Sequence, residues 1–259
     1  MREHLTIIKV GGKVVEEPES LKSLLKDFSR IAGHKILVHG GGKTATHLAE
    51  QLGIESKMVE GRRITDAETL KVVTMVYAGL VNKTVVAGLQ SLGTNAIGLT
   101  GADLDIIRAE KRPVGDIDYG FVGDVQKVNS TLLGTLINSG IIPVFCAITH
   151  DGKGQLLNTN ADTIASELAI ALSEIFDVTL NYCFEKPGVL FDAEDDNSVI
   201  TSINQELYAT LKADGAIHSG MIPKLDNCFN SLQKGVQKIK IGHHRMLNDT
   251  KALYTTITL

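Results

Sequence analysis

Short apolar runs alternate along the chain with segments in which apolar residues recur every three or four positions. The continuous runs predict buried strands at 5–12, 36–39, 96–99, 141–148, 178–180 and 239–241. The spaced pattern predicts helices at 21–31, 45–52 and 130–139, and another helix after Asn160. Such alternation favours an α/β fold in which an open, mainly parallel sheet is sandwiched between helices.

The segment 102–128 departs from this pattern, because it is rich in Gly and Asp and holds only short β-like pieces. We expect it to form an insertion that carries a hairpin. The chain has 259 residues and shows no fixed-period repeat and no linker-like tract. One large domain, or two closely joined lobes, is therefore expected.

Composition argues against several classes of function. The formal net charge is −4 without blocks of like charge, so we expect no nucleic-acid partner. No apolar run approaches the ~20 residues of a membrane span, and a strand begins almost at the N-terminus, so we expect neither a membrane partner nor a signal peptide. The three cysteines lie far apart, which predicts core thiols in a reducing cytoplasm. The eight histidines have no ligand spacing and are expected at the surface.

Lys9 is the first candidate for chemistry, because it lies in an apolar run that ends at Gly11 and Gly12. An unpaired ammonium is costly to bury, so Lys9 should face an anion to which the glycine N–H groups can also donate. The alternative is an edge-strand lysine whose ammonium reaches water.

A second glycine cluster, Gly40-Gly41-Gly42, follows a predicted strand and opens a predicted helix, where backbone N–H groups can bind an anion. A P-loop is not complete, because Leu37 stands where its first glycine is required. The cluster does fit a permissive dinucleotide fingerprint, with Glu60 roughly 20 residues farther on. An NAD(P)-dependent oxidoreductase is therefore one rival hypothesis.

The adjacent Arg62 and Arg63 suit the capture of a carboxylate or phosphate, although a solvated hairpin explains them equally well. In the segment Asn158 to Asp162, Asn160 can cap the following helix, and Asp162 can support the helix dipole or hold lysines in place.

The segment Ser219-Gly220-Met221-Ile222-Pro223-Lys224 predicts another helix start, because Pro223 suits a first turn. Lys224 then lies at the positive end of the helix dipole, which favours a bound anion there. Two lysines, Lys9 and Lys224, with Asp162 between them form a constellation that indicates phosphoryl transfer.

In order and approximate spacing, these motifs resemble the amino-acid kinase family over nearly the whole chain. The matching segments are Ile8-Lys9-Val10-Gly11-Gly12, His39 to Gly42, Gly61-Arg62-Arg63-Ile64-Thr65, Asn158 to Asp162 and Gly220-Met221-Ile222-Pro223-Lys224. Within the family, the chain is similar to members that phosphorylate the γ-carboxylate of N-acetyl-L-glutamate, the second step of the acylated route to arginine.

The resemblance implies a single domain over 1–259. Its N-terminal lobe, about 1–173, would bind the acylated amino acid and dimerise, and its C-terminal lobe, about 174–259, would bind ATP with Mg²⁺. A cytoplasmic homodimer is implied. We expect it to be insensitive to arginine, because arginine-sensitive relatives carry an extra N-terminal helix and the first strand here begins near Leu5.

The resemblance also implies roles for individual residues. Lys9 and Lys224 would stabilise the transferring phosphoryl group, and Asp162 would orient both lysines. The other implied contacts are phosphate at Gly11 and Gly12, substrate at Gly41 and Gly42, the α-carboxylate at Arg63, the α-carboxylate or amide end at Asn158, and nucleotide at Ser219, Gly220 and Met221. No protein metal ligand is implied. An attacking carboxylate is already ionised at neutral pH, so no general base is needed.

Two departures from the family pattern keep alternatives open. The segment Leu180-Asn181-Tyr182-Cys183-Phe184-Glu185-Lys186-Pro187-Gly188-Val189 lacks the aspartate that is usual after this strand, so a relative without ATP binding is one alternative. Arg62 stands where common relatives have a neutral residue, and a second cation could pair with a second carboxylate. N-succinyl-L-glutamate is therefore the alternative acceptor, and another member of the family is a more remote one.

Overall fold

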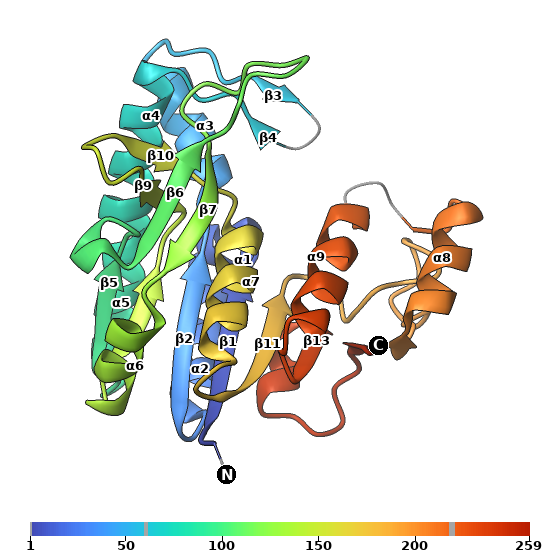
Figure 1. Cartoon of the computed structure of the whole chain (residues 1–259). Coiled ribbons are helices and arrows are strands. Elements are labelled where there is room, and N and C mark those ends of the chain that lie inside the picture. Colours follow the sequence, from blue (N-terminus) through green and yellow to red (C-terminus); the bar gives the residue numbers. More distant parts are fainter. Residues whose placement is uncertain (1, 60–61, 218–220) are drawn as a thin grey trace.

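The computed structural model describes residues 2–59, 62–217 and 221–259. An eight-stranded sheet with the order β12-β14-β13-β11-β1-β2-β8-β5 runs through the centre of the molecule (Figure 1). Its strands are β1 (His4–Val10), β2 (His34–His39), β5 (Ala96–Leu99), β8 (Ile142–Phe145), β11 (Asp177–Cys183), β12 (Ser202–Ile203), β13 (Lys238–Gly242) and β14 (Thr255–Ile257). β13 and β14 run antiparallel, and the other neighbouring strands run parallel.

Helices cover both faces of this sheet. They are α1 (Gly12–Glu16), α2 (Pro18–Arg30), α3 (Gly42–Gln51), α4 (Ala67–Thr74), the π-helical η1 (Met75–Val81), α5 (Asn82–Gln90), the short η2 (Asp103–Asp105), α6 (Ser130–Asn138), α7 (Ala161–Leu172), α8 (Gln205–Ala213), α9 (Ile222–Gln233) and the short η3 (His244–Leu247). α6, α7 and α9 pack in one layer, and α1, α2, α3 and α5 pack in the other (Figure 1). The predicted α/β fold with a mainly parallel sheet is therefore confirmed.

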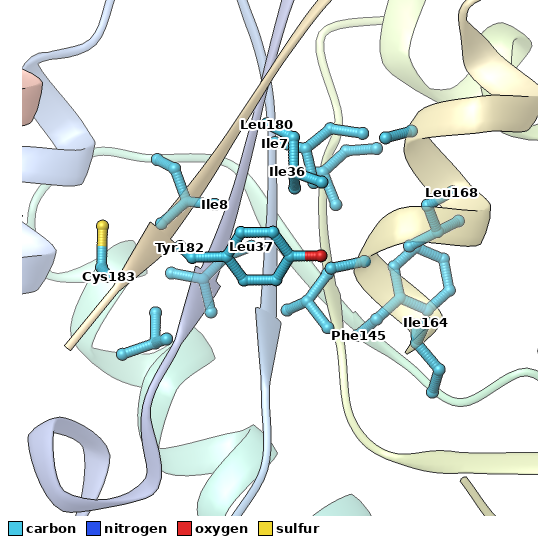
Figure 2. Packing of buried hydrophobic residues seen from close by; sticks show 14 of the residues in the cluster. Ile7, Ile8, Ile36, Leu37, Phe145, Ile164, Leu168, Leu180, Tyr182 and Cys183 are labelled. Atoms are coloured by element: carbon cyan, nitrogen blue, oxygen red, sulfur yellow. The ribbon is translucent and has the colours of Figure 1, made fainter. Parts of the chain in front are cut away.

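The strands are apolar on both sides because helices bury both faces of a parallel sheet. Figure 2 shows this core, in which Ile7, Ile36 and Leu180 from three neighbouring strands lie close to Leu168 of α7. Removing this much apolar surface from water is the dominant favourable term in folding. The core holds β1 and β11 rigidly side by side, which fixes the position of the residues at their C-terminal ends.

A smaller sheet with the order β10-β9-β6-β7 lies beside the main one. Its strands are β6 (Ile107–Lys111), β7 (Gly123–Val128), β9 (Ile148–His150) and β10 (Leu156–Asn158), and a separate hairpin joins β3 (Met58–Val59) to β4 (Arg62–Arg63). The antiparallel β6–β7 pair confirms the predicted hairpin insertion. The single strand predicted at 141–148 is wrong, because the chain leaves the main sheet after β8 and enters the smaller sheet at β9.

The sequence pattern missed the helical segment Ala67–Gln90, which comprises α4, η1 and α5. Its 24 residues are apolar enough to cross a membrane by length and composition, which corrects the expectation that no such run exists. Apolar side chains such as Met75 and Leu80 also lie on its exposed side, so the apolar stripe of its buried face is not distinct in the sequence. In the fold, that face packs through Val73, Val76, Val85 and Leu89 into the common core.

Candidate active site

Lys9, Asp162 and Lys224 form a compact cluster, called the lysine clamp below. The Nζ atom of Lys9 lies 2.6 Å from Asp162 Oδ1, and the Nζ atom of Lys224 lies 2.6 Å from Asp162 Oδ2. Lys9 is the penultimate residue of β1, and the other two residues lie in the first turns of α7 and α9. Three elements that are far apart in sequence therefore meet at one carboxylate, as the sequence predicted.

The lysine clamp is charged and mostly shielded from solvent. Burial alone would raise the pKa of Asp162, but the ammonium groups of Lys9 and Lys224 outweigh burial and hold that pKa far below its usual range. Burial lowers the pKa of Lys9, and the Asp162 carboxylate opposes that shift. The three side chains are 14–20% exposed, so a small part of each stays accessible to solvent or to a bound anion. When both lysines are protonated, one positive charge stays uncompensated, which favours an anion.

Two glycine turns lie beside the lysine clamp, and one predicted contact there is wrong. The N–H group of Gly11 donates to the carbonyl oxygen of Cys183 at 2.8 Å, because Gly11 continues the β1–β11 ladder. It is therefore not available to the phosphoryl group in this conformation. Gly12 begins α1 and stays a predicted phosphate ligand. Gly41 precedes α3 with φ of 152°, and a Cβ atom there would lie 3.0 Å from the ring of Tyr77, so a side chain is not tolerated.

His39 holds the second glycine turn, Gly40 to Gly42, from within the core. Its ring is fully buried, with Nδ1 2.8 Å from the carbonyl oxygen of Gly40 and Nε2 3.1 Å from Nδ2 of Asn82. The amide of Asn82 also donates to the carbonyl oxygen of Val144. These partners assign a neutral ring that donates from Nδ1 and accepts at Nε2. The expected surface position of the histidines is therefore wrong for His39, and it is also wrong for His244, which is buried.

Titration of His39 should make the protein less stable in acid. Burial lowers the pKa of His39 from 6.5 to about 4, so the folded protein resists a proton that the unfolded chain binds. The contribution to stability is complete above pH 6.5 and is lost as the pH falls towards 4. Between pH 7.5 and pH 5, the free energy of unfolding should fall by about 2 kcal/mol through this group.

Urea unfolding of the wild type and of His39→Gln at both pH values isolates this effect. The variant should lose about 2 kcal/mol less between the two pH values, since its side chain does not titrate. If the free energy of unfolding changed equally with pH in the two proteins, His39 would not contribute to the loss of stability in acid.

A cavity of about 190 Å³, called the arginine pocket below, opens beside the glycine turn. It is lined by Gly40, Gly41, Gly42, Met58, Arg62, Arg63, Tyr77, Arg112, Val122, Ala147, Asn158, Thr159, Asn160, Ala161 and Thr163. Four predicted substrate residues, Gly41, Gly42, Arg63 and Asn158, therefore meet in one cavity. A larger cavity of about 520 Å³ lies between α2 and α5, and its lining contains none of the predicted site residues.

Arg63 and Arg62 have different surroundings. Arg63 is buried, so a solvated hairpin does not describe it. Its Nη1 donates to Ser56 Oγ at 2.8 Å, and its Nη2 donates at 2.8 Å to the carbonyl oxygen of Gly42 and to Thr46 Oγ1. Arg63 therefore fixes the start of α3, and its contact with a substrate carboxylate stays a prediction. Arg62 is exposed and lines the arginine pocket.

Arg112 belongs to the arginine pocket, although the sequence reasoning missed it. Its guanidinium pairs with Asp124, with Nη2 2.6 Å from Oδ1, and its carbon Cζ lies 5.3 Å from the centre of the Tyr119 ring. Its Nη1 atom is buried and has no hydrogen-bond partner within the part of the chain that the structure describes. No local motif marks Arg112, because Asp124 is 12 positions away on the opposite strand of the hairpin.

The segment before α7 contains a predicted substrate residue, Asn158, and a helix cap, Asn160. Asn158 is buried, and its Nδ2 donates to Thr65 Oγ1 at 2.9 Å, which directs the amide and leaves Oδ1 to accept from another group. Asn160 Oδ1 accepts from the N–H groups of Asp162 and Thr163 at 2.7 and 3.3 Å. The predicted cap is confirmed, and Asp162 is left to hold the lysines.

A third cavity, of about 270 Å³, lies in the C-terminal part of the chain. It is lined by Phe184, Lys186, Gly188, Val189, Leu190, Ala193, Ala216, Ile217 and Met221. Met221, a predicted nucleotide contact, lines this cavity, and its contact with nucleotide stays a prediction, whereas Ser219 and Gly220 fall outside the described residues. The unusual 180–189 segment supplies one wall of this mainly apolar cavity, which suits a flat, uncharged base more than a phosphate.

The described residues do not provide a protein-held metal site. Among them, no group of three or more His, Cys, Asp or Glu side chains could hold a metal ion. Both carboxylate oxygens of Asp162 are already occupied by the ammonium groups of Lys9 and Lys224. A divalent cation at this site would therefore have to be held by the phosphates of a nucleotide.

The three cysteines are buried and unbridged, as predicted.

Comparison with known proteins agrees with this geometry. Acetylglutamate kinase of Phocaeicola vulgatus is 64% identical over 249 residues, which cover 96% of this chain and 97% of that protein. Acetylglutamate kinase of Bacteroides thetaiotaomicron is also 64% identical, over 97% of this chain and 98% of that protein. The crystal structure of smu.665 from Streptococcus mutans covers 98% of both chains with a TM-score of 0.81 at 25% identity.

None of these three relatives supports the rival hypothesis of a dinucleotide-dependent oxidoreductase, and Glu60 of its fingerprint lies outside the described residues. The sequence pattern of the amino acid kinase family matches residues 4–243, a span that includes the lysine clamp, both glycine turns and the arginine pocket. The resemblance found from the motifs is thus confirmed, and the chain belongs to the amino acid kinase family.

Proposed function

We propose that the protein transfers the γ-phosphoryl group of ATP to the γ-carboxylate of N-acetyl-L-glutamate, the second step of the acylated route to arginine. The observation that carries this proposal is the lysine clamp, in which two ammonium groups share one carboxylate beside a cavity with carboxylate-binding groups. Relatives that are 64% identical over nearly the whole chain and are named acetylglutamate kinase support the acceptor.

The reaction needs positioning and charge neutralisation more than proton transfer. An oxygen of the ionised γ-carboxylate attacks the γ-phosphorus, the bond to the β–γ bridging oxygen breaks, and ADP leaves with that electron pair. Lys9 and Lys224 would neutralise charge on the phosphoryl oxygens and the leaving group. Asp162 would hold both ammonium groups without touching the substrate. The carboxylate is already ionised near neutral pH, so no base is required.

The arginine pocket would hold the acceptor. The Oδ1 of Asn158, which the donation from Nδ2 to Thr65 leaves as an acceptor, suits the amide N–H of an N-acylated amino acid, which a free amino acid lacks. Gly41 and Gly42 allow the γ-carboxylate to approach the backbone closely, and Arg63 would direct the α-carboxylate. The cavity around Met221 would take the adenine base, and Mg²⁺ would arrive bound to the phosphates of ATP.

An acceptor panel tests this proposal. ADP release should depend on N-acetyl-L-glutamate, with L-glutamate and N-acetyl-L-aspartate giving at least tenfold lower kcat/KM, since one lacks the acyl amide and the other is one methylene short. Release of ADP without an acceptor would indicate a simple ATPase. No release with any acceptor would favour the non-catalytic alternative.

A second acceptor, N-succinyl-L-glutamate, is favoured by a specific observation. The buried Nη1 of Arg112 has no partner among the described residues, and the exposed Arg62 lines the same pocket. Neither cation is needed by N-acetyl-L-glutamate if Arg63 holds its α-carboxylate. The extra carboxylate of a succinyl group would satisfy both, and the pairing of Arg112 with Asp124 would pre-orient the guanidinium for it.

Leucine at position 62 or 112 should reveal which acyl group the pocket prefers. If the succinyl compound is the better substrate, Arg112→Leu should lower its kcat/KM by about tenfold or more, since a lost charge-assisted hydrogen bond costs about 1.5–3 kcal/mol. Activity with the acetyl compound should change less than threefold, and Arg62→Leu should act in the same direction but more weakly. Equal effects on both acceptors in both variants would exclude a succinyl subsite.

We propose a cytoplasmic homodimer without nucleic-acid or membrane partners. Exposed apolar side chains on η1 and on the edge strand β5, including Met75, Leu80 and Ile97, offer a surface for a second copy. Light scattering should give the molar mass of a dimer, and free arginine should not change that mass. Free arginine should also leave the kinase activity uninhibited. Leu80→Glu should yield monomers, whereas Leu253→Glu, at a comparably exposed leucine elsewhere, should not. A monomeric or hexameric wild type would contradict the proposal.

A further inference from the structure

Tyr182 contacts two members of the lysine clamp from within the core. It lies on β11 as the register partner of Lys9 on β1, and its side chain is 1% exposed. The Nζ atom of Lys224 lies 4.8 Å from the centre of its ring. Its hydroxyl lies 3.4 Å from the backbone carbonyl oxygen of Asp162, and Figure 2 shows the ring pointing, hydroxyl first, towards the side of the sheet on which Ile164 and Leu168 of α7 lie.

This geometry gives Lys224 a second attractive partner. The Asp162 carboxylate holds one part of the ammonium at 2.6 Å, and the face of the Tyr182 ring lies within cation–π range. A long lysine side chain has many rotamers, so two partners restrict it more than one does. The hydroxyl contact with the first turn of α7 also limits sliding of the ring. An aliphatic side chain would fill the same core space without attracting the ammonium.

The surroundings of Tyr182 fit a supporting role and exclude proton transfer. Burial raises the pKa of its hydroxyl well above the ordinary value, so the group stays neutral. The ring is buried and lines neither the arginine pocket nor the cavity around Met221, so it is not placed to touch the acceptor or the base. Any effect of Tyr182 on turnover must therefore pass through the lysine clamp.

We propose that Tyr182 is a positioning residue whose ring holds the Lys224 ammonium in its phosphoryl-binding place. The inference rests on the proposed phosphoryl transfer, because it assigns Lys224 a role in turnover. Tyr182→Phe keeps the ring, so its kcat should stay within about threefold of wild type. Tyr182→Leu keeps apolar bulk without the ring, so its kcat should fall about tenfold, with both KM values within about twofold.

A double-mutant cycle with Lys224→Met separates positioning from a structural role. If Tyr182 acts through Lys224, then Tyr182→Leu should lower kcat less than twofold in the Lys224→Met background. Tyr254→Leu is the matched control, because Lys240 lies 4.5 Å from that ring outside the site, and kcat should not change. If the leucine variant does not fold, Tyr182→Met takes its place in the same cycle with the same expected outcomes.

The same tenfold fall in both backgrounds, or an equal fall in Tyr182→Phe, would overturn the assignment. A wild-type kcat in Tyr182→Leu would also overturn it, and would leave the proposed function intact. Absence of turnover in the wild type would instead remove the proposed function itself, so the two failures are distinguishable.

Discussion

Lys9→Met and Lys224→Met should each lower kcat by about 10²–10³-fold and change both KM values by less than about threefold. Each lysine is a preorganised donor aimed at charge that develops in the transition state, and removing one such donor costs about 3–4 kcal/mol in other enzymes. The methionine side chain keeps length and apolar packing, so the lost ammonium dominates the effect. Steady-state kinetics with varied ATP and varied acceptor measures both quantities.

Lys35→Met is the matched control for these variants. Lys35 is also buried, on β2, but its Nζ donates to the carbonyl oxygens of Phe28, Ser29 and Ile31 at the end of α2. Its loss leaves those carbonyl groups without their donor, so Tm should fall while kcat stays the same. An unchanged kcat in Lys9→Met or Lys224→Met would remove that residue from the site, whatever its effect on Tm.

Asp162→Asn should fold and turn over about 10²-fold more slowly. The amide keeps the shape of the carboxylate but loses the charge that holds both ammonium groups at 2.6 Å. Its helix-dipole role is worth only ~0.3–1 kcal/mol, so the loss of stability from that source should be small. Without Asp162, burial and the charge of Lys224 should lower the pKa of Lys9 further, since the carboxylate opposes both.

The pH dependence of kcat distinguishes this effect from general damage. The alkaline limb of the profile should move to lower pH in Asp162→Asn, because Lys9 loses its proton more easily. Asp66→Asn is the control, since Asp66 caps α4 through the N–H group of Thr69 and lies outside the lysine clamp. Full turnover with reduced stability in Asp162→Asn would mean that Asp162 only supports its helix.

The sequence predicted the lysine clamp because each member breaks a local rule. A lysine in a buried strand and a lysine at the positive end of a helix are both unfavourable without an anion. Asp162 stood out because Asn160 alone suffices as the cap. Gly11 was misjudged because its position in the ladder beside Cys183 depends on strand pairing, which the local motif does not contain.

The residues that the sequence did not reveal owe their roles to distant partners. Arg112 is oriented by Asp124 across a hairpin, and Asn82 meets His39 from a helix that no apolar stripe marked. Tyr182 lies in the segment 180–189 that departs from the family pattern, and its ring contacts Lys224. Long-range pairs of this kind depend on sheet order and helix packing, so composition and spacing do not predict them.

A hydroxylamine trap tests the central claim most directly, because an acyl phosphate reacts with hydroxylamine to form a hydroxamate. With ATP, Mg²⁺ and N-acetyl-L-glutamate, the wild type should form the γ-hydroxamate of N-acetyl-L-glutamate in equal amount to ADP, and Lys224→Met should form it about 10²–10³-fold more slowly. ADP without hydroxamate, or no product with either the acetyl or the succinyl acceptor, would contradict phosphoryl transfer to the γ-carboxylate.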